Sequence, residues 1–441
     1  MAREVLITGV GPVSGLGLGI KPTWEKLLAG ESAVEPIEAF DASGFTSRIA
    51  AQVKDLKIRD FVPKSYRKAS KVMARDIELA VAAADLAARD AGLVTRGTDP
   101  EDSPTYEPAR VGAHIGAGLI AADLDELTSA LIESVDEHGR FDMHKWGAEG
   151  MGHLTPLWLL KYLPNMLACH VTIIHDAQGP SNTVTCNEAS GLLSLGESVR
   201  AIQRGVADVC FCGGTDSKLN PAAMLRQQFT GRLNESHDRP AHEAVRPFDS
   251  DASGGVIGEG GGIFILEARD TLERRGTGEP YAVVAGFGAS QTVNRQSRNL
   301  TPDPEGRGIA RAIGAALRDA TVIPEDIDLI VPFGCGDPAW DQAECSALRS
   351  VFGEHVCEIP LAPTKSMMGN CGAGAGALDL CIASQIVHQQ KAPAVINCDR
   401  PLDLLNAAAH PAREITLRNV LIYATGVGGQ NAAVVLRSLE V

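Results

Sequence analysis

Short apolar runs alternate with longer amphipathic stretches along most of the chain. The runs "EVLITGVG" (4–11) and "GGIFILEA" (261–268) are short, continuous and apolar, and each predicts a buried strand. The alanine-rich stretch 76–93 predicts a long helix, and the stretch 96–110 predicts a polar loop that contains prolines. Alternation of strands and helices over most of a chain is typical of an α/β protein.

A weak internal repeat suggests two related halves. Residues 181–214 and 361–398 both show the order strand, short turn, helix, strand. The charged, irregular stretch 230–250 predicts a division between halves 1–250 and 251–441, and 441 residues suit two packed units better than one simple core. If each half carries such a strand-to-helix elbow, we expect the two elbows to meet at one shared site.

The first elbow carries a carboxylate. A predicted strand at 181–185 leads into a short turn and then a helix of small and apolar residues. Enzymes often mount a nucleophile on such an elbow, because it places one side chain at a helix N-terminus. The elbow residue here is Glu188, and the neighbouring thiol, Cys186, comes two residues earlier. A helix N-terminus stabilises a carboxylate as it does a thiolate.

Composition narrows the possible functions. The net charge of −15 argues against nucleic acid and anionic membranes as partners. Apolar runs stay shorter than the roughly 18 residues of a membrane span. The ten cysteines lack the spacing of a disulfide framework, so we expect reduced thiols in the cytoplasm.

Neither a metal ion nor a cofactor is expected. The sequence has no C-x-x-C or H-E-x-x-H motif. The glycine clusters at 9–15 and 372–377 look like dinucleotide loops, but Pro12 disrupts the first, and the second lacks the acidic residue expected about 20 residues later. We expect these glycines to let helices pack closely on a sheet instead.

Five segments resemble β-ketoacyl-acyl-carrier-protein synthases. They are "REVLITGVGPVSGLGLGIKPTWEKLLAGESAV", "GPSNTVTCNEASGLLSLGESVRAIQRGVADVCFCGG", "RPFDSDASGGVIGEGGGIFILE", "APTKSMMGNCGAGAGALD" and "TGVGGQNAAVVL". The resemblance keeps its order from about residue 3 to 438. It implies the thiolase fold, in which two similar α/β halves form an α-β-α-β-α stack, and it implies a dimer that works with an acyl carrier protein.

The resemblance also assigns site positions. The family cysteine falls on Glu188, the first family histidine on Phe333 in "FGCGDPAWDQAE", and the second on Asn370 in "KSMMGN". All three reacting groups of the family are therefore replaced. Three charged residues keep their family positions, namely Asp341, Glu344 and Lys365. Around Glu188 we expect a former acyl-thioester pocket whose further members are Cys186, Cys335, Asp337, Lys365, Cys371, Thr425 and Val427.

These replacements argue against condensation. A carboxylate that attacked a thioester would form a reactive anhydride, which holds an acyl chain poorly. The enolate formed from malonyl thioester needs two hydrogen-bond donors; Asn370 supplies one and Phe333 none, and losing one donor typically costs about 10²–10³ in rate. Cys335 and Asp337 replace the threonines that meet the carrier's pantetheine arm, and the gating phenylalanines become Thr425 and Val427.

Three functions stay open. Non-catalytic chain-length factors look like synthases with Gln at the elbow, so the chain is predicted to be a similar subunit, paired with a catalytic ketosynthase or with itself. Alternatively, it processes acyl thioesters as an acyltransferase or decarboxylase, with Glu188 as base or Cys186 as nucleophile. A binding protein for a lipid-like ligand is the third. Cys186, Cys335 and Cys371 could approach one another, either as a metal site or as neighbours in an inactive pocket.

A basic segment suggests the partner. Lys64, Arg67, Lys68 and Lys71 place four positive charges within eight residues of an acidic protein. The resemblance implies that this segment docks an acidic acyl carrier protein. The alternative is a solvated helix start.

Overall fold

A large mixed sheet forms the centre of the protein. The computed structural model describes residues 3–294, 297 and 300–439. In this part of the chain a ten-stranded sheet has the order β10-β13-β14-β9-β1-β8-β7-β5-β6, with β2 paired to β1. Two small two-stranded sheets accompany it. The strands are β1 (Val5–Ser14), β2 (Gly17–Leu18), β3 (Val34–Pro36), β4 (Ile49–Ala51), β5 (Val111–Ala117), β6 (Ser181–Val184), β7 (Val209–Asp216), β8 (Gly260–Ala268), β9 (Ala282–Gln291), β10 (Leu329–Val331), β11 (Lys391–Ala392), β12 (Arg413–Glu414), β13 (Asn419–Thr425) and β14 (Gln430–Arg437).

The sheet consists of two similar halves. In the first half, β5 pairs with β7 in parallel, β7 pairs with β8 antiparallel, and β8 pairs with β1 antiparallel. In the second half, β10 pairs with β13 in parallel, β13 pairs with β14 antiparallel, and β14 pairs with β9 antiparallel. The halves join where β1 pairs with β9 over only two residue pairs. The two similar halves predicted from the sequence are therefore confirmed. The strands predicted within 361–398 are not: Leu361 forms only an isolated bridge with Ile330, and the segment ends with the two-residue strand β11, which belongs to a small separate sheet.

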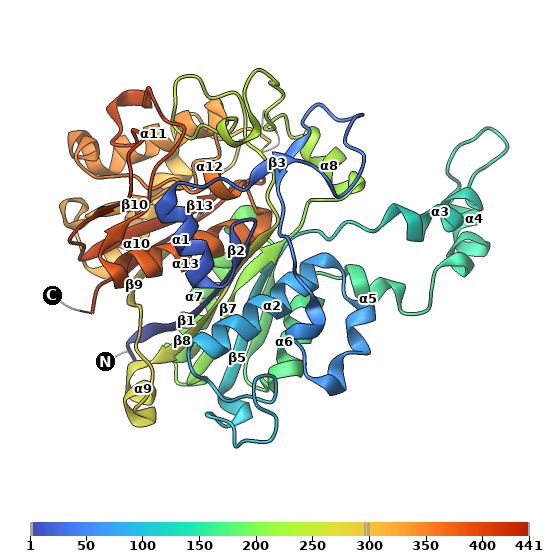
Figure 1. Cartoon of the computed structure of the whole chain (residues 1–441), viewed down its shortest axis with the longest axis horizontal. Helices are drawn as coiled ribbons and strands as arrows, with labels where there is room; N and C mark the ends of the chain where they lie inside the picture. The colour runs from blue at the N-terminus through green and yellow to red at the C-terminus, as the bar shows by residue number, and fades with distance from the viewer. Residues whose placement is uncertain (1–2, 295–296, 298–299, 440–441) are drawn as a thin grey trace.

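Helices complete a five-layer stack. They are α1 (Ile20–Ala29), α2 (Arg75–Asp90), α3 (Leu124–Ile132), α4 (Met143–Ala148), α5 (Trp158–Tyr162), α6 (Met166–His175), α7 (Ser190–Gln203), α8 (Pro221–Gln228), α9 (Arg269–Arg275), α10 (Arg307–Ala320), α11 (Pro338–Phe352), α12 (Lys365–Met368) and α13 (Ala375–Gln389). Figure 1 shows α2 and α6 outside the first half of the sheet and α10 and α11 outside the second, with α7 and α13 between the halves. This is the predicted α-β-α-β-α architecture.

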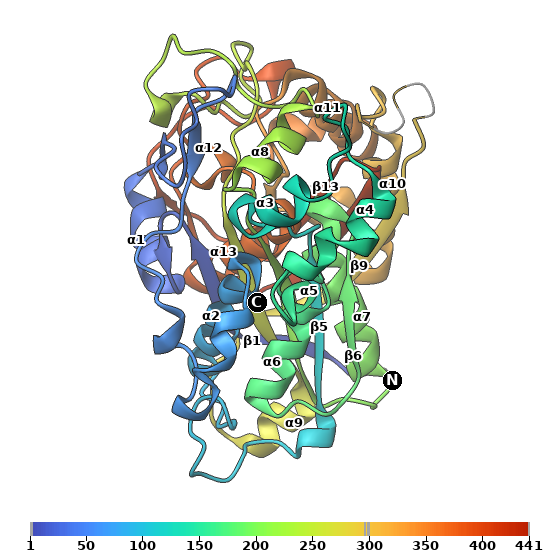
Figure 2. The same cartoon turned by 90° about the vertical axis from the view of Figure 1, so that its right-hand side faces the viewer.

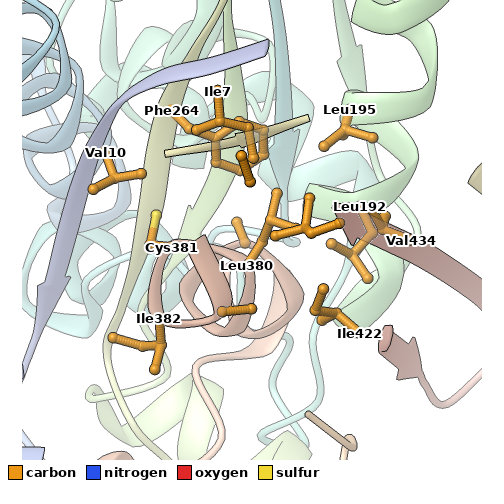
Figure 3. Packing of buried hydrophobic residues seen from close by; sticks show 14 of the residues in the cluster. Ile7, Val10, Leu192, Leu195, Phe264, Leu380, Cys381, Ile382, Ile422 and Val434 are labelled. Atoms are coloured by element: carbon orange, nitrogen blue, oxygen red, sulfur yellow. The ribbon is translucent and has the colours of Figure 1, made fainter. Parts of the chain in front are cut away.

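The two elbow helices pack tightly in the middle layer. Figure 3 shows Leu192 of α7 and Leu380 of α13 among side chains from both halves of the sheet, such as Phe264 and Val434. A Cβ atom at Gly191 would lie 2.6 Å from the Cβ of Ala377, so glycine is needed where α7 crosses α13. This close crossing brings the two elbows together, as expected from the repeat.

An arm projects from the body between β5 and α6. It carries α3, α4 and α5. Figure 1 shows it extending away from the sheet, and Figure 2 shows it in front of the body. Its exposed large apolar side chains include Leu119, Ile132, Phe141, Met143, Met151, Leu157 and Leu159. The sequence pattern gave no prediction for this arm, because its helices are too short to produce a sustained 3.6-residue period.

Most predicted elements occur close to their expected positions. The helix predicted at 76–93 is α2, and 96–110 is a loop that ends in a single 3₁₀ turn. The strand predicted at 261–268 is β8, but it completes the first half of the sheet, because it pairs with both β1 and β7. Among the described residues, every helix falls short of the length or the apolar character that crossing a bilayer requires.

Candidate functional site

The first elbow places Glu188 inside the protein. β6 ends at Val184, a 3₁₀ turn covers Asn187–Ala189, and α7 begins at Ser190. The Ser190 hydroxyl accepts a hydrogen bond from the Cys186 amide at 2.8 Å and donates one to the Asn187 carbonyl at 2.6 Å, which fixes the turn. The Glu188 side chain is only 3 % exposed. The elbow therefore buries its carboxylate instead of presenting it to solvent.

A buried ion pair holds the Glu188 carboxylate. Arg232, from the irregular stretch 230–250, donates from Nη2 to Glu188 Oε1 at 2.6 Å. Asn370 donates from Nδ2 to the same oxygen at 3.1 Å. The Arg232 guanidinium also lies 5.1 Å from the ring centroid of Trp340, a favourable cation–π arrangement. Glu188 is thus bonded to the stretch 230–250 and to the second elbow at once.

The ion pair decides the charge of Glu188. Burial by itself would raise the pKa of the carboxyl, but the Arg232 charge and the bonds from Arg232 and Asn370 outweigh burial and hold the pKa below its ordinary value. Glu188 is therefore ionised at neutral pH. A carboxylate with a lowered pKa is a weak proton acceptor, so it is poorly suited to general base catalysis.

Two polar atoms of the pair lack a hydrogen-bond partner among the described residues. They are Glu188 Oε2 and Arg232 Nη1. Oε2 lies against the backbone of Gly426, where a Cβ atom would come within 2.3 Å of it. A cavity of about 20 Å³ is lined by Arg232, Cys335 and Asn370. This volume has room for roughly one water molecule, and it is too small for an acyl chain.

Phe333 places a buried apolar ring near the ion pair. It is fully buried, and its ring meets Trp340 edge to face at a centroid distance of 6.4 Å. The Lys365 ammonium lies 5.3 Å from the Phe333 ring centroid and forms an ion pair with Asp379. The structure therefore places Asn370 in contact with Glu188, and it connects Phe333 to Arg232 through the single ring of Trp340.

Asp341 and Glu344 support the loops around this site. Asp341 accepts from the backbone amides of Phe248 at 2.7 Å and Gly336 at 3.2 Å. Glu344 accepts from the Gly334 amide at 3.0 Å and from the Tyr423 hydroxyl at 2.8 Å. Burial raises the pKa of Glu344 to about 7. Both acids hold the backbone that carries Phe333 in place.

The three cysteines of interest differ in environment. Cys186 is half-buried, whereas Cys335 and Cys371 are buried. Burial raises the pKa of each thiol above its ordinary value, so none is favoured as a thiolate at neutral pH. Within the described part of the chain, no three His, Cys, Asp or Glu side chains are arranged to hold a metal ion.

The remaining predicted pocket residues make structural contacts. Asp337 caps the N-terminus of α11 by accepting from the amides of Ala339 at 3.0 Å and Trp340 at 3.1 Å. The Thr425 hydroxyl donates to Asn431 at 2.7 Å. The carbonyl of Val427 accepts from the Asn187 side chain, next to the elbow. The C-terminal loop therefore packs directly over Glu188.

The basic segment lies on the surface. The side chains of Lys64, Arg67, Lys68 and Lys71 are all exposed, and within the described residues no ion pair neutralises them. The segment forms two 3₁₀ turns, Lys64–Tyr66 and Ala69–Val72, and α2 begins only afterwards. It is therefore a separate surface feature and not the first turn of a helix.

Arg232 is the site residue that sequence reasoning missed. Glu188 on an otherwise small and apolar elbow signals that a positive partner is needed. The stretch 230–250 contains three arginines. Arg239 pairs with Asp251 at the surface and Arg246 with Asp249, so only the folded arrangement selects Arg232.

A five-layer stack with an elbow at its centre defines the class of thiolase-like proteins. Family models agree, since residues 2–271 match the β-ketoacyl synthase N-terminal domain and residues 281–399 match the C-terminal domain. The chain therefore belongs to the β-ketoacyl synthase family, which works in fatty acid and polyketide synthesis.

Known relatives match over the full length. The chain is 32% identical to 3-oxoacyl-[acyl-carrier-protein] synthase 2 of Coxiella burnetii, with 98% of each chain covered. It is also 32% identical to the putative polyketide beta-ketoacyl synthase 1 of Streptomyces halstedii, covering 100% of this chain and 99% of the relative.

Solved structures show the same fold. The ishigamide ketosynthase/chain length factor superposes with a TM-score of 0.82 at 28% identity, covering 99% of this chain and all of that one. A β-ketoacyl synthase from Burkholderia phymatum superposes with a TM-score of 0.84 at 24% identity, over the whole of both chains.

Proposed function

We propose that this protein is a β-ketoacyl-synthase-type subunit that does not condense acyl chains, and that it acts beside a catalytic partner in the manner of a chain-length factor. The observation that carries the proposal is the ionised Glu188, held by Arg232 and Asn370 at the elbow where the family resemblance expects a cysteine. A carboxylate fixed in a buried ion pair cannot take over the role of a thiolate nucleophile. An assay of carbon–carbon bond formation from acyl and malonyl carrier thioesters tests the proposal.

The alternative of acyl-thioester processing has less support. Glu188 would have to act as a base, but its pKa is lowered, and it already accepts two hydrogen bonds. Cys186 would have to act as a nucleophile, but burial raises the pKa of its thiol. A ligand-binding role in place of catalysis would need room near Glu188, and the cavity lined by its two partners, Arg232 and Asn370, measures about 20 Å³. A cytoplasmic location stays a prediction.

The partner of the basic segment is an acyl carrier protein. A solved neighbour of this chain is a type II polyketide ketosynthase in complex with its acyl-carrier protein. In this chain, four exposed cations within eight residues contrast with a net charge of −15, so an acidic partner would be attracted to this one surface.

Charge reversal at Lys64, Arg67 and Lys68 is expected to weaken carrier binding at least tenfold at low salt. The three substitutions to Glu replace attraction by repulsion, and screening by about 0.5 M salt should remove most of the difference. Binding is measured by titration calorimetry with an acyl carrier protein at two salt concentrations. The matched control reverses three other exposed cations, Lys21, Arg311 and Arg318, and should leave binding unchanged. If both variants lose the same affinity for the carrier protein, the effect comes from net charge alone, and docking on the basic segment is contradicted.

The subunit dimerises through β6. This strand forms the outer edge of the sheet, and Ser181 and Asn182 on it are exposed. Its inner side bonds β5, since the Ala113 amide donates to the Pro180 carbonyl at 2.9 Å. The Thr183 amide donates only to the neighbouring Asn182 side chain, at 2.8 Å, so the outer side is available for another strand. The apolar arm would add contact surface.

Thr183→Pro is expected to convert the dimer to a monomer. Proline removes the outward amide of an edge strand without touching the bonds to β5. Light scattering at micromolar concentration measures the mass, first of the subunit alone and then with a catalytic ketosynthase subunit present. Thr183→Val keeps the amide and should keep the dimer. A wild-type mass of one chain in both experiments would refute the dimer.

A further inference from the structure

A second cavity lies far from the elbow. It measures about 180 Å³ and is bounded by the loop 93–108, the end of α6 and the first residues of β5 and β7. Strand β5 runs from the cavity to the elbow. Its first residue, Val111, pairs with Val209, which lines the cavity, and Gly116 pairs with Val184, the last strand residue before the elbow. Five residues of strand separate these pairs, roughly 17 Å at 3.3 Å per residue. The cavity therefore does not belong to the site described above.

The cavity wall combines apolar and polar side chains. Val111, Val209 and Phe211 form an apolar side, and His175, the last residue of α6, lies beside it. His175 is 3 % exposed, and its ring lies 4.7 Å from that of Phe211. The charged side chains in the lining are Arg96, Asp102 and Asp176, and Arg96 pairs with Asp176 at 3.6 Å.

The hydrogen bonds around His175 determine which nitrogen carries the proton. The Thr95 hydroxyl oxygen accepts from the amides of Gly97 and Thr98, both at 3.2 Å, so both of its lone pairs are used. Its own proton therefore goes to His175 Nδ1, 2.8 Å away. The Thr98 hydroxyl is not available to Thr95 as a donor, because it donates to the Leu93 carbonyl at 2.9 Å. Nδ1 is thus an acceptor.

Nε2 of His175 is then an N–H donor. Burial lowers the pKa of His175 to about 3, so the ring is neutral and has one proton, which must lie on Nε2. Nε2 is buried and has no partner among the described residues. Buried donors are almost always satisfied, so an unmet N–H in the wall of a cavity indicates a missing acceptor.

We propose that this cavity is a ligand site for a small molecule with an apolar body, packed on the Phe211 side, and a carbonyl-type oxygen, which accepts a hydrogen bond from His175 Nε2. A cavity of about 150 Å³ accommodates a benzene ring, so about 180 Å³ suits a ligand of roughly ten non-hydrogen atoms. This inference does not depend on the function proposed for the elbow.

Acetophenone and α-methylstyrene are a matched pair of probes. They have the same shape and the same number of non-hydrogen atoms, and they differ in a carbonyl oxygen against a methylene group. Each is titrated into the full-length protein, with calorimetry for affinity and ¹⁵N-histidine NMR for the site. Of the eleven histidines, His175 is assigned as the signal lost in His175→Phe. Acetophenone, but not α-methylstyrene, is expected to shift the Nε2 resonance.

His175→Phe isolates the hydrogen bond. Phenylalanine keeps the ring and its packing on Phe211 but has no donor. The affinity ratio of acetophenone to α-methylstyrene is expected to fall about tenfold in this variant, and comparing ratios cancels the difference in hydrophobicity between the probes. An unchanged ratio would overturn the proposal. So would the failure of acetophenone to bind the wild-type protein at millimolar concentration, since a bound water would then be the simpler occupant.

A second variant tests the site independently, in case His175→Phe does not fold. Val111→Phe adds bulk to the cavity wall without changing a polar group. It is expected to weaken both probes together, by at least tenfold. Undiminished binding of both probes would place them elsewhere and contradict the site.

Discussion

Replacement of Arg232 by methionine is expected to lower the free energy of unfolding by about 3–5 kcal/mol. The substitution leaves the Glu188 carboxylate in a site where it is 3 % exposed and retains only the bond from Asn370. A buried charge without its partner loses hydration and gains nothing in return. Chemical denaturation at pH 7 measures the change.

A double variant shows whether the loss of stability comes from an unpaired charge or from altered packing. Glu188→Gln alone leaves the buried Arg232 guanidinium without a counter-charge and should also destabilise the fold. Glu188→Gln combined with Arg232→Met removes both charges and is expected to recover most of the loss, so the two changes are strongly non-additive. Arg274→Met, which removes an exposed ion pair with Asp270, serves as control and should change stability by less than about 0.5 kcal/mol. If Arg232→Met proves as mild as this control, the buried ion pair does not form.

The elements of this fold are encoded locally, which is why the sequence predicts them. The run at 4–11 is mostly apolar, and β1 is buried at every position. The helix at 76–93 shows its apolar face through its own spacing, and α2 occupies most of that range. The first strand, elbow and helix are also visible in the chain, because they lie within one continuous segment. The second copy has the elbow and the helix, but its predicted first strand is only an isolated bridge at Leu361.

Contacts between distant segments were harder to predict. Glu188 and Arg232 are separated by 44 positions, and Glu188 and Asn370 by 182. Nothing near Arg232 in sequence distinguishes it from Arg239 or Arg246. From the sequence, the helix N-terminus favours an ionised Glu188, whereas apolar walls would oppose it. The structure adds the Arg232 charge, which comes from a distant segment and lowers the pKa of Glu188 against the effect of burial. The correspondence of Glu188, Phe333 and Asn370 to the family's reacting residues stays a prediction.

Condensation of acyl and malonyl carrier thioesters by the wild-type protein is expected to be undetectable. By the predicted correspondence to the family, three groups that act together are replaced, and such groups fail together instead of additively. Glu188→Cys alone should not restore turnover. Phe333 still offers no donor to the enolate oxygen, and a missing donor costs about 10²–10³ in rate.

The decisive comparison is between that single variant and the triple variant Glu188→Cys, Phe333→His and Asn370→His. If these positions correspond to the family's reacting residues, only the triple variant should form the new carbon–carbon bond, measured as β-ketoacyl product by mass spectrometry. Malonyl decarboxylation is followed in the same samples, because it needs the donors but not the nucleophile. Glu188→Ala is the control and should be as inactive as the wild type. Turnover by the wild-type protein that Glu188→Ala or Cys186→Ala abolishes would overturn the proposed function and identify the group that carries the reaction.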